Sequence, residues 1–197
     1  RNLARLRHPS IVTAYEAGED DGVYFLAMEY VEGESLDQWL HREGTLPEAK
    51  ALEIVRTIAG ALDYAWREHD FLHRDLKPGN IMMDTEGVAR LMDMGLAKSL
   101  ADDNRMTLSG TVLGTPHYMS PEQADGTQEL DARSDIYGLG ATLYHLVTGT
   151  TPYSGDTPLQ VLSSHLNAVF PDPQVRAPNV SAPCCELLEK MMAKRPE

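Results

Sequence analysis

A long amphipathic pattern is the feature that most constrains how this chain can fold. Between Pro47 and about His69, the apolar residues that recur at steps of three and four are Leu52, Val55, Ile58, Ala59, Leu62, Ala65 and Trp66. That spacing predicts one helix with a single buried face, begun at a proline that the first helical turn tolerates. A dense polar segment, 73–80, follows the helix and precedes two short β-like runs.

The remaining patterns divide the chain into a small β part and a larger helical part. We expect strands at 11–17, 23–30, 81–83 and 89–92, and helices at 2–6, 36–41, 135–147, 159–166 and 184–192. The acidic turn 19–22 favours a hairpin between the first two strands, and Ser35 favours a helix cap. The segment 98–131 has no clear period and is expected to be a long loop. This order predicts an α+β chain with two unequal lobes that join near 30–33.

Composition excludes several classes of function. The 197 residues carry 17 Lys and Arg against 30 Asp and Glu, a net charge of −13, which disfavours a broad nucleic-acid or anionic-membrane surface. No apolar run reaches the ~18 residues of a membrane span, and no signal peptide is expected. The two cysteines, Cys184 and Cys185, are adjacent, so we expect a reducing compartment rather than a disulfide framework.

The segment 73–80 carries the densest chemical signal. It places a carboxylate, an ammonium and a carboxamide close together, as Asp75, Lys77 and Asn80, and Asp93 follows at the end of the second short strand. Asp and Asn oxygens suit Mg²⁺, which takes few protein ligands and completes its shell with phosphate and water. A separate Asp and Lys can serve a nucleophile and a phosphate group.

These residues stand in an ordered series of motifs. The series is Met28-Glu29-Tyr30-Val31-Glu32-Gly33, then His73–Asn80, Asp93-Met94-Gly95, the segment 114–122, and Ser134–Gly140. The chain resembles a Ser/Thr protein kinase, and more narrowly the bacterial eukaryotic-like kinases, over essentially its whole length. The resemblance implies a bilobal α+β kinase-like fold with a partial small β lobe. Residues 1–31 are then the remnant of the N-lobe and hinge, 32–197 the C-lobe, and 93–122 the activation segment.

The resemblance implies a catalytic set that uses ATP and Mg²⁺, with Mn²⁺ as an alternative. Asp75 is expected to orient the substrate hydroxyl and accept its proton. Lys77 is expected to neutralise the transferring γ-phosphate and to favour serine or threonine substrates. Asn80 and Asp93 are expected to hold the metal. Thr115 is expected to hydrogen-bond near Asp75 and Lys77 and to shape the substrate groove.

The same resemblance implies a nucleotide pocket and a brace for the catalytic loop. The backbone of Glu29 and Val31 is expected to meet adenine. Met28 is expected to guard the back of the pocket, and Met82 to form its floor. Asp135 is expected to hold the catalytic loop from the helix beneath it.

Arg74 suggests regulation by phosphorylation. An arginine beside the catalytic aspartate can pair with a phosphate on the activation segment. That segment contains Thr107, Ser109 and Thr111, and Thr111 is favoured because it lies just before the Gly114-Thr115-Pro116 run.

Several family features are missing from the sequence or altered in it. Met94 stands where phenylalanine is usual, and Ser120 where alanine is commoner. The sequence has no glycine-rich phosphate loop, no strand lysine of the Val-Ala-Ile-Lys kind and no partner glutamate. The arginine that pairs with Glu122 in the family is expected just after Glu197. We therefore expect a piece cut inside the domain at both ends, weak or inactive by itself, from an active parent protein.

Two other functions remain open. The first is a kinase-like nucleotide-binding or scaffolding domain without turnover, which the missing amino-terminal elements favour. The second is a small-molecule phosphotransferase, which Lys77 and the segment 114–122 disfavour. A zinc site at His69 and His73 lacks a third ligand. We expect protein substrates, self-association for trans-autophosphorylation, no nucleic acid and no membrane contact from this segment. The expected location is cytoplasmic, with a parent protein that other segments could anchor to a membrane.

Overall fold

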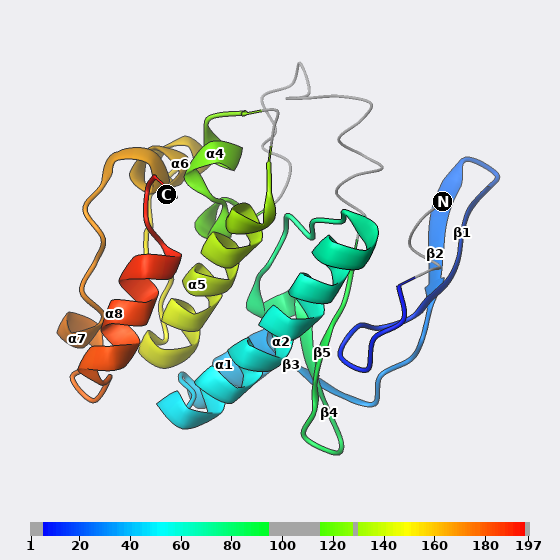
Figure 1. The fold of residues 1–197 in the computed structure, drawn as a ribbon, viewed down its shortest axis with the longest axis horizontal. Helices are drawn as coiled ribbons and strands as arrows, with labels where there is room; N and C mark the ends of the chain where they lie inside the picture. The colour runs from blue at the N-terminus through cyan, green and yellow to red at the C-terminus, as the bar shows by residue number, and fades with distance from the viewer. Residues whose placement is uncertain (1–5, 95–114, 128–129, 196–197) are drawn as a thin grey trace.

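The computed structural model describes residues 6–94, 115–127 and 130–195. The chain folds into three neighbouring parts (Figure 1). A β hairpin lies at one end, a small sheet with two helices lies in the middle, and a helical body lies at the other end. The strands are β1 (Ala14–Asp20), β2 (Val23–Met28), β3 (Gly33–Ser35), β4 (Ile81–Asp84) and β5 (Ala89–Leu91). The helices are α1 (Leu36–Glu43), α2 (Glu48–His69), α4 (Pro121–Ala124), α5 (Ala132–Thr148), α6 (Pro158–Asn167), α7 (Pro173–Arg176) and α8 (Ala182–Met191), with 3-10 turns η2 (Pro78–Asn80) and η3 (Pro116–Tyr118).

The predicted long helix is confirmed as α2, although its buried face is rotated from the expected one. Its buried residues are Ala51, Ile54, Val55, Ile58, Ala61, Leu62 and Ala65. Ala59 is exposed, and Leu52 and Trp66 are half-buried. Helix α2 packs against both α5 and β5. The small residues Ala51 and Ala61 are fully buried, whereas the bulky Trp66 is half-buried.

Helix α5 is the centre of the helical body. Thirteen of its residues are buried, from Ser134 to Thr148, and it packs against both α2 and α8. It begins at the Asp131 cap, earlier than the expected 135, and ends at Gly149 in the left-handed conformation (φ 72°). A helix that is apolar on nearly every side must be enclosed, so it supplies a rigid base for the segments packed on it.

The predicted hairpin is confirmed as the antiparallel pair β1–β2. Asp21 and Gly22 both have positive φ (47° and 79°), which the tight turn between twisted strands requires. The second sheet has the antiparallel order β3–β4–β5. Strand β3 was not predicted, since its three residues carry no β pattern and become a strand only by pairing with β4. Ser35 then caps α1 in a capping box with Gln38, as its sequence position predicted.

The expected loop over 98–131 is wrong in its described part. Residues 115–127 contain η3 and α4, and α4 begins at Pro121 behind a capping box of Ser120 and Gln123. These short elements have no apolar period, so only their caps could have revealed them. The short helix α7 was missed for the same reason. The helix expected at 2–6 lies almost wholly outside the described residues.

Within the described part of the chain, no helix is both long enough and apolar enough to cross a membrane.

A buried imidazole joins α6 to α5. His165 is fully buried, and its Nδ1 lies 2.9 Å from the hydroxyl of Tyr137. Lys194 lies on the same side of α6, where its Nζ donates to the carbonyl of His165 at 2.7 Å. Burial, reinforced by the Lys194 charge, lowers the pKa of His165 to about 4.

We expect His165 to make stability fall as the pH falls from about 6.5 to about 4. In this pH range the unfolded chain binds a proton at His165 that the folded chain excludes. The free energy of unfolding therefore falls by about 3 kcal/mol in all. His165→Asn keeps an acceptor for Tyr137, and it should flatten this part of the unfolding free energy against pH. The exposed His41→Asn is the control. Equal slopes for wild type and His165→Asn contradict the assignment.

Candidate active site

Asp135 fixes the start of the polar segment 73–80. This carboxylate lies in the first turn of α5 and is 4% exposed. Its two oxygens accept the backbone N–H groups of His73 and Arg74, each at 2.8 Å. Burial raises the pKa of Asp135, and the two N–H groups oppose that shift by stabilising the ionised form. The predicted brace from the helix beneath the loop is therefore confirmed in geometry.

His73 continues this anchoring on the other side. Its ring is 1% exposed, with Nδ1 3.3 Å from the N–H of Asp75 and Nε2 2.8 Å from the carbonyl of Met92. A carbonyl can only accept and an N–H can only donate, so the proton sits on Nε2 and the lone pair on Nδ1. His73 is thus a structural bridge between the segment 73–80 and the strand that leads to Asp93.

Asp75, Lys77 and Thr115 form one connected group. The Nζ of Lys77 lies 2.7 Å from Oδ2 of Asp75 and donates to the hydroxyl of Thr115 at 3.0 Å. The side chains of Lys77 and Asp75 are 27% and 31% exposed, so the pair is open to a ligand. The predicted approach of Thr115 to Lys77 is confirmed, although 38 residues separate them in sequence.

Asn80 is oriented by its amide nitrogen. Its Nδ2 donates to the carbonyl of Asp75 at 2.8 Å and to Oδ2 of Asp75 at 3.2 Å, and Oδ1 is the acceptor atom of the same amide. The carbonyl of Asn80 accepts the N–H of Met92 at 2.9 Å. Because Asp93 follows Met92 directly, this bond places the Asn80 and Asp93 segments side by side.

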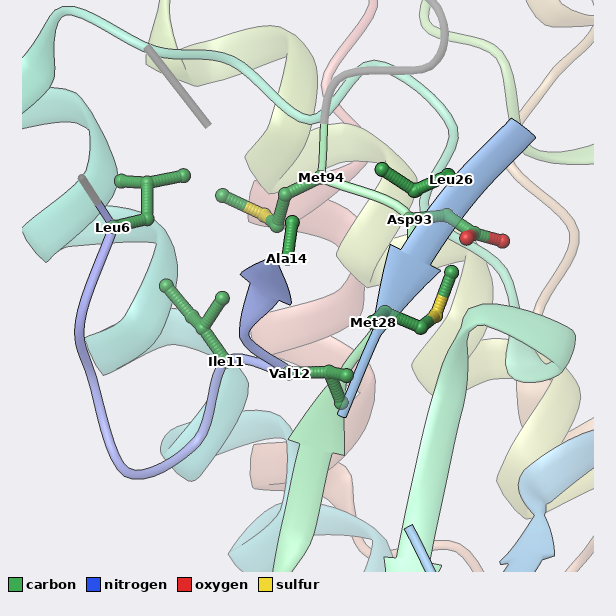
Figure 2. Close-up of a pocket in the computed structure, with 8 residues that line it drawn as sticks. All are labelled: Leu6, Ile11, Val12, Ala14, Leu26, Met28, Asp93 and Met94. Atoms are coloured by element: carbon green, nitrogen blue, oxygen red, sulfur yellow. The ribbon is translucent and has the colours of Figure 1, made fainter. Parts of the chain in front are cut away.

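Asp93 lies at the edge of a small apolar pocket (Figure 2). The pocket is lined by Leu6, Ile11, Val12, Ala14, Leu26, Met28, Asp93 and Met94. Figure 2 shows Leu26 and Met28 of β2 beside Asp93, and Leu6 and Met94 on the opposite side. The backbone of Asp93 is left-handed (φ 56°), a conformation that turns its carboxylate away from the strand.

The donor set suits a hard cation with few protein ligands. The Oδ1 of Asn80 and the carboxylate of Asp93 are both oxygens, which Mg²⁺ prefers. No group of three or more His, Cys, Asp or Glu side chains suited to a metal occurs among the described residues. Mg²⁺ takes its remaining ligands from phosphate and water.

The other expected nucleotide contacts are distributed around this pocket. Met28 lines it together with Asp93, whereas Met82 lies on β4 opposite Ser35 and does not line it. Glu29 lies one residue beyond β2 and faces a separate groove. In the described ranges, the backbone N–H and C=O of Val31 have no hydrogen-bond partner.

Arg74 has a strained backbone and an unpaired guanidinium atom. Its φ is 68°, and its Nε is buried without a hydrogen-bond partner in the described part of the chain. Thr107, Ser109 and Thr111 lie outside the described residues. The structure therefore presents a buried donor without showing what meets it.

Sequence reasoning missed two contacts that position the segment after Thr115. The Nε2 of Gln123 donates to the carbonyl of Arg74 at 2.8 Å, and the hydroxyl of Tyr118 lies 2.8 Å from Nδ1 of His145 on α5. Burial raises the pKa of Tyr118 and lowers that of His145. Glutamine and histidine carry no motif signal here, and only the packing of η3 and α4 brings them into contact.

The arrangement can orient a hydroxyl group and bind a phosphate. A carboxylate and an ammonium lie in contact, beside a threonine hydroxyl and an oxygen set suited to a divalent cation. Such a group can accept a proton at Asp75 while Lys77 offsets negative charge on a transferring phosphoryl group.

The relatives found by comparison with known proteins are protein kinases. The protein kinase domain family matches residues 1–197. Serine/threonine-protein kinase PknB of Mycobacterium leprae is 38% identical over 201 residues, covering 100% of this chain and 32% of that protein. PknB of Mycolicibacterium smegmatis is 38% identical over 202 residues, with 100% and 32% covered. A protein of Clostridium perfringens named as a probable serine/threonine-protein kinase is 38% identical over 194 residues, with 98% and 28% covered. The chain spans about a third of the length of these curated relatives.

We expect Asp135→Asn to loosen the segment 73–80 from α5. An amide offers one acceptor where the carboxylate offers two, so one buried N–H loses its partner, at a cost of about 2 kcal/mol. Hydrogen exchange at the His73 and Arg74 amides should accelerate. The control is Asp131→Asn at the cap of the same helix, where the partly exposed charge is worth less than about 1 kcal/mol. Unchanged protection of both amides contradicts the role given to Asp135.

Proposed function

This chain belongs to the protein kinase family, and we propose that it is the catalytic part of a serine/threonine protein kinase. The reaction transfers the γ-phosphate of ATP to a serine or threonine hydroxyl of a protein. The observation that carries the proposal is the contact of Lys77 with both Asp75 and Thr115, on a segment held by the buried Asp135. Names of relatives that are serine/threonine kinases support the choice of hydroxyl.

Asp75 is the proton acceptor in this proposal. The substrate hydroxyl oxygen forms a bond to the γ-phosphorus as the bond from that phosphorus to the β,γ-bridging oxygen breaks. The hydroxyl proton passes to Asp75, and ADP leaves with the bridging oxygen. Lys77, already beside Asp75, lies where it can offset the charge on the transferring group. Thr115 lies where it can align the substrate with this pair.

Asn80 and Asp93 are the proposed ligands of Mg²⁺, with Mn²⁺ as an alternative. The cation, when bound with ATP, neutralises phosphate charge. The bonds from Asn80 Nδ2 to Asp75 hold Oδ1 in one orientation. The bond between Asn80 and Met92 keeps Asp93 next to it.

The segment after β2 is the proposed adenine contact. The N–H of Glu29 is used by Thr13, at 2.8 Å, whereas the backbone of Val31 has no partner in the described ranges. Unpaired polar groups favour a ligand with matching donors and acceptors. We assign Met28 to the back of this pocket. Met82 lies outside the lining of the pocket, on β4, and we propose it as the floor of the wider nucleotide site.

The domain limits and partners are also part of this proposal. Residues 1–31 contribute the remnant of the N-lobe and the hinge, 32–197 the C-lobe, and 93–122 the activation segment. Protein substrates dock near Thr115, and a second copy of the kinase serves as substrate in trans-autophosphorylation. The parent protein works in the cytoplasm, with or without a membrane anchor in another segment.

A nucleotide-binding scaffold without turnover is the alternative. It requires that the full-length protein bind ATP and transfer no phosphate. Transfer to an aminoglycoside but not to a protein would instead indicate a small-molecule phosphotransferase. The intact group of Asp75, Lys77, Asn80 and Asp93 favours the protein kinase over the scaffold. Lys77 and the segment 114–122 favour it over the small-molecule phosphotransferase.

Asp75→Asn in the full-length protein should lower the rate of phosphate transfer steeply. The amide cannot accept the hydroxyl proton, so kcat should fall by about 10²–10⁴-fold. ATP affinity should stay within about threefold, because Asp75 meets the hydroxyl rather than adenine. Radiolabelled transfer to a protein substrate and calorimetric ATP binding measure the two quantities. Glu86→Gln, an exposed change in the β4–β5 turn, is the control. A kcat for Asp75→Asn within about tenfold of the wild-type value contradicts the mechanism.

Phosphorylation of Thr107, Ser109 or Thr111, with Thr111 favoured, is proposed to engage Arg74. The unpartnered Nε of Arg74 supports a phosphate partner. Replacement of all three residues by alanine should lower activity at least about tenfold, equivalent to one charge-assisted hydrogen bond. Mass spectrometry of the active protein should find the phosphate. Full kinase activity in the triple variant would contradict this proposal.

A further inference from the structure

Arg90 joins three segments that meet behind the nucleotide pocket. It lies on β5, and its side chain is 27% exposed. Its Nη1 lies 2.7 Å from Oε1 of Glu29, and its Nε lies 3.2 Å from Oδ2 of Asp84. One guanidinium therefore links the segment after β2 to both β4 and β5, using donors that point in different directions.

The Asp84 side of this link is firmly anchored. The other oxygen of Asp84 accepts the N–H groups of Glu86 and Val88, at 3.0 and 2.8 Å, in the turn between β4 and β5. Asp84 is 13% exposed as a side chain, and β4 and β5 pair with each other. Arg90 thus connects Glu29 to a firmly hydrogen-bonded part of the sheet.

The Glu29 side of the link ends at the proposed adenine contact. Glu29 is held by Thr13 in two ways: its own N–H donates to the carbonyl of Thr13 at 2.8 Å, and its Oε2 accepts the N–H of Thr13 at 3.3 Å. Arg90 adds the third restraint. These bonds use the side chain and the N–H of Glu29, so its carbonyl is the remaining polar group for a ligand.

The hairpin depends on few other connections to the sheet. Figure 1 shows β1 and β2 at the end of the molecule, beyond β5. The N–H of Val12 donates to the carbonyl of Leu91 at 2.9 Å, and the N–H of Leu91 donates to the carbonyl of Ser10 at 2.8 Å. Those bonds fix the strand that enters β1. The Arg90–Glu29 pair is the corresponding tie at the exit of β2.

The groove around the Arg90–Glu29 pair also contains a second arginine, Arg7, for comparison. It is lined by Arg7, His8, Pro9, Ile11, Thr13, Tyr15, Glu29 and Arg90. Arg7 shares the groove but forms no ion pair among the described residues, whereas Arg90 forms two. The same groove therefore holds one arginine that fixes Glu29 and one that does not.

We propose that Arg90 is a positioning residue for nucleotide binding: it holds Glu29 so that the backbone of residues 29–31 keeps the geometry that adenine requires. This inference rests on the proposed function, because it assigns residues 29–31 to the nucleotide. Arg90 touches no reacting atom in this account and acts only through Glu29. Its loss also leaves Glu29 and Asp84 without the cation they share.

The test compares Arg90→Met, Arg90→Lys and Arg7→Met in the full-length protein. We expect Arg90→Met to raise the KM for ATP about tenfold and to leave kcat within about twofold, since positioning in the ground state is lost and the reacting groups are not. Arg90→Lys should recover part of the loss, because one ammonium replaces only part of the fork. Arg7→Met should leave KM within about twofold.

A double-variant cycle shows whether the effect passes through Glu29. In a Glu29→Ala background, Arg90→Met should raise KM little further. A full additional tenfold rise overturns the proposal, as does an unchanged KM in Arg90→Met alone. A fall in kcat and in the thermal midpoint with KM unchanged identifies Arg90 as merely structural, and it too overturns the proposal.

The ATP dissociation constant separates this inference from the proposed function. If the wild-type protein binds ATP without transferring phosphate, the kinase proposal fails. The dissociation constants of the Arg90 variants then still decide the role of Arg90. If the wild-type protein binds no ATP, the Arg90 proposal fails as well.

Discussion

The site depends on a single buried carboxylate. Asp135 is enclosed at the start of α5, and its two oxygens hold the N–H groups of two successive residues, His73 and Arg74. A buried carboxylate is costly unless it is hydrogen-bonded, so the loop cannot leave it without a large loss of stability. This bond also keeps Arg74 in a left-handed conformation that few side chains adopt. The strain and the brace together set the direction in which the next residue, Asp75, projects.

Hydrogen bonds of the main chain, rather than ion pairs, connect this anchored loop to Asp93. The two backbone groups of Met92 bond to the His73 ring and to the carbonyl of Asn80. Asp93 is thereby placed beside the loop before any cation binds. On the far side of the pocket, the hairpin is tied to the same sheet by β5. The pocket is lined by the hairpin and the segment that enters it, together with Asp93 and Met94. The Met92 bonds place the braced loop beside Asp93.

The sequence predicted much of this arrangement, but not all. Features that depend only on local residues could be predicted. These are the period of α2, the acidic turn of the hairpin and the cap at Ser35. The rotated face of α2, with Ala59 exposed, depends on which neighbours pack against it. Strand β3 exists only through β4, and α4 only through its cap. The grouping of Asp75, Lys77, Asn80 and Asp93 was expected from motif resemblance. The contacts of Gln123, His145 and Arg90 join residues far apart in sequence, and no local pattern marks them.

The most direct test of the account is a crystal structure of the full-length protein with Mg²⁺ and a non-hydrolysable ATP analogue. The account expects Oδ1 of Asn80 and the carboxylate of Asp93 to bind the cation at about 2.1 Å, with adenine against the backbone of Glu29 and Val31. It also expects the Asp135 bonds to His73 and Arg74 to be unchanged. A nucleotide bound elsewhere, or a cation held without Asn80 and Asp93, would contradict the central claim that this braced loop is a phosphoryl-transfer site.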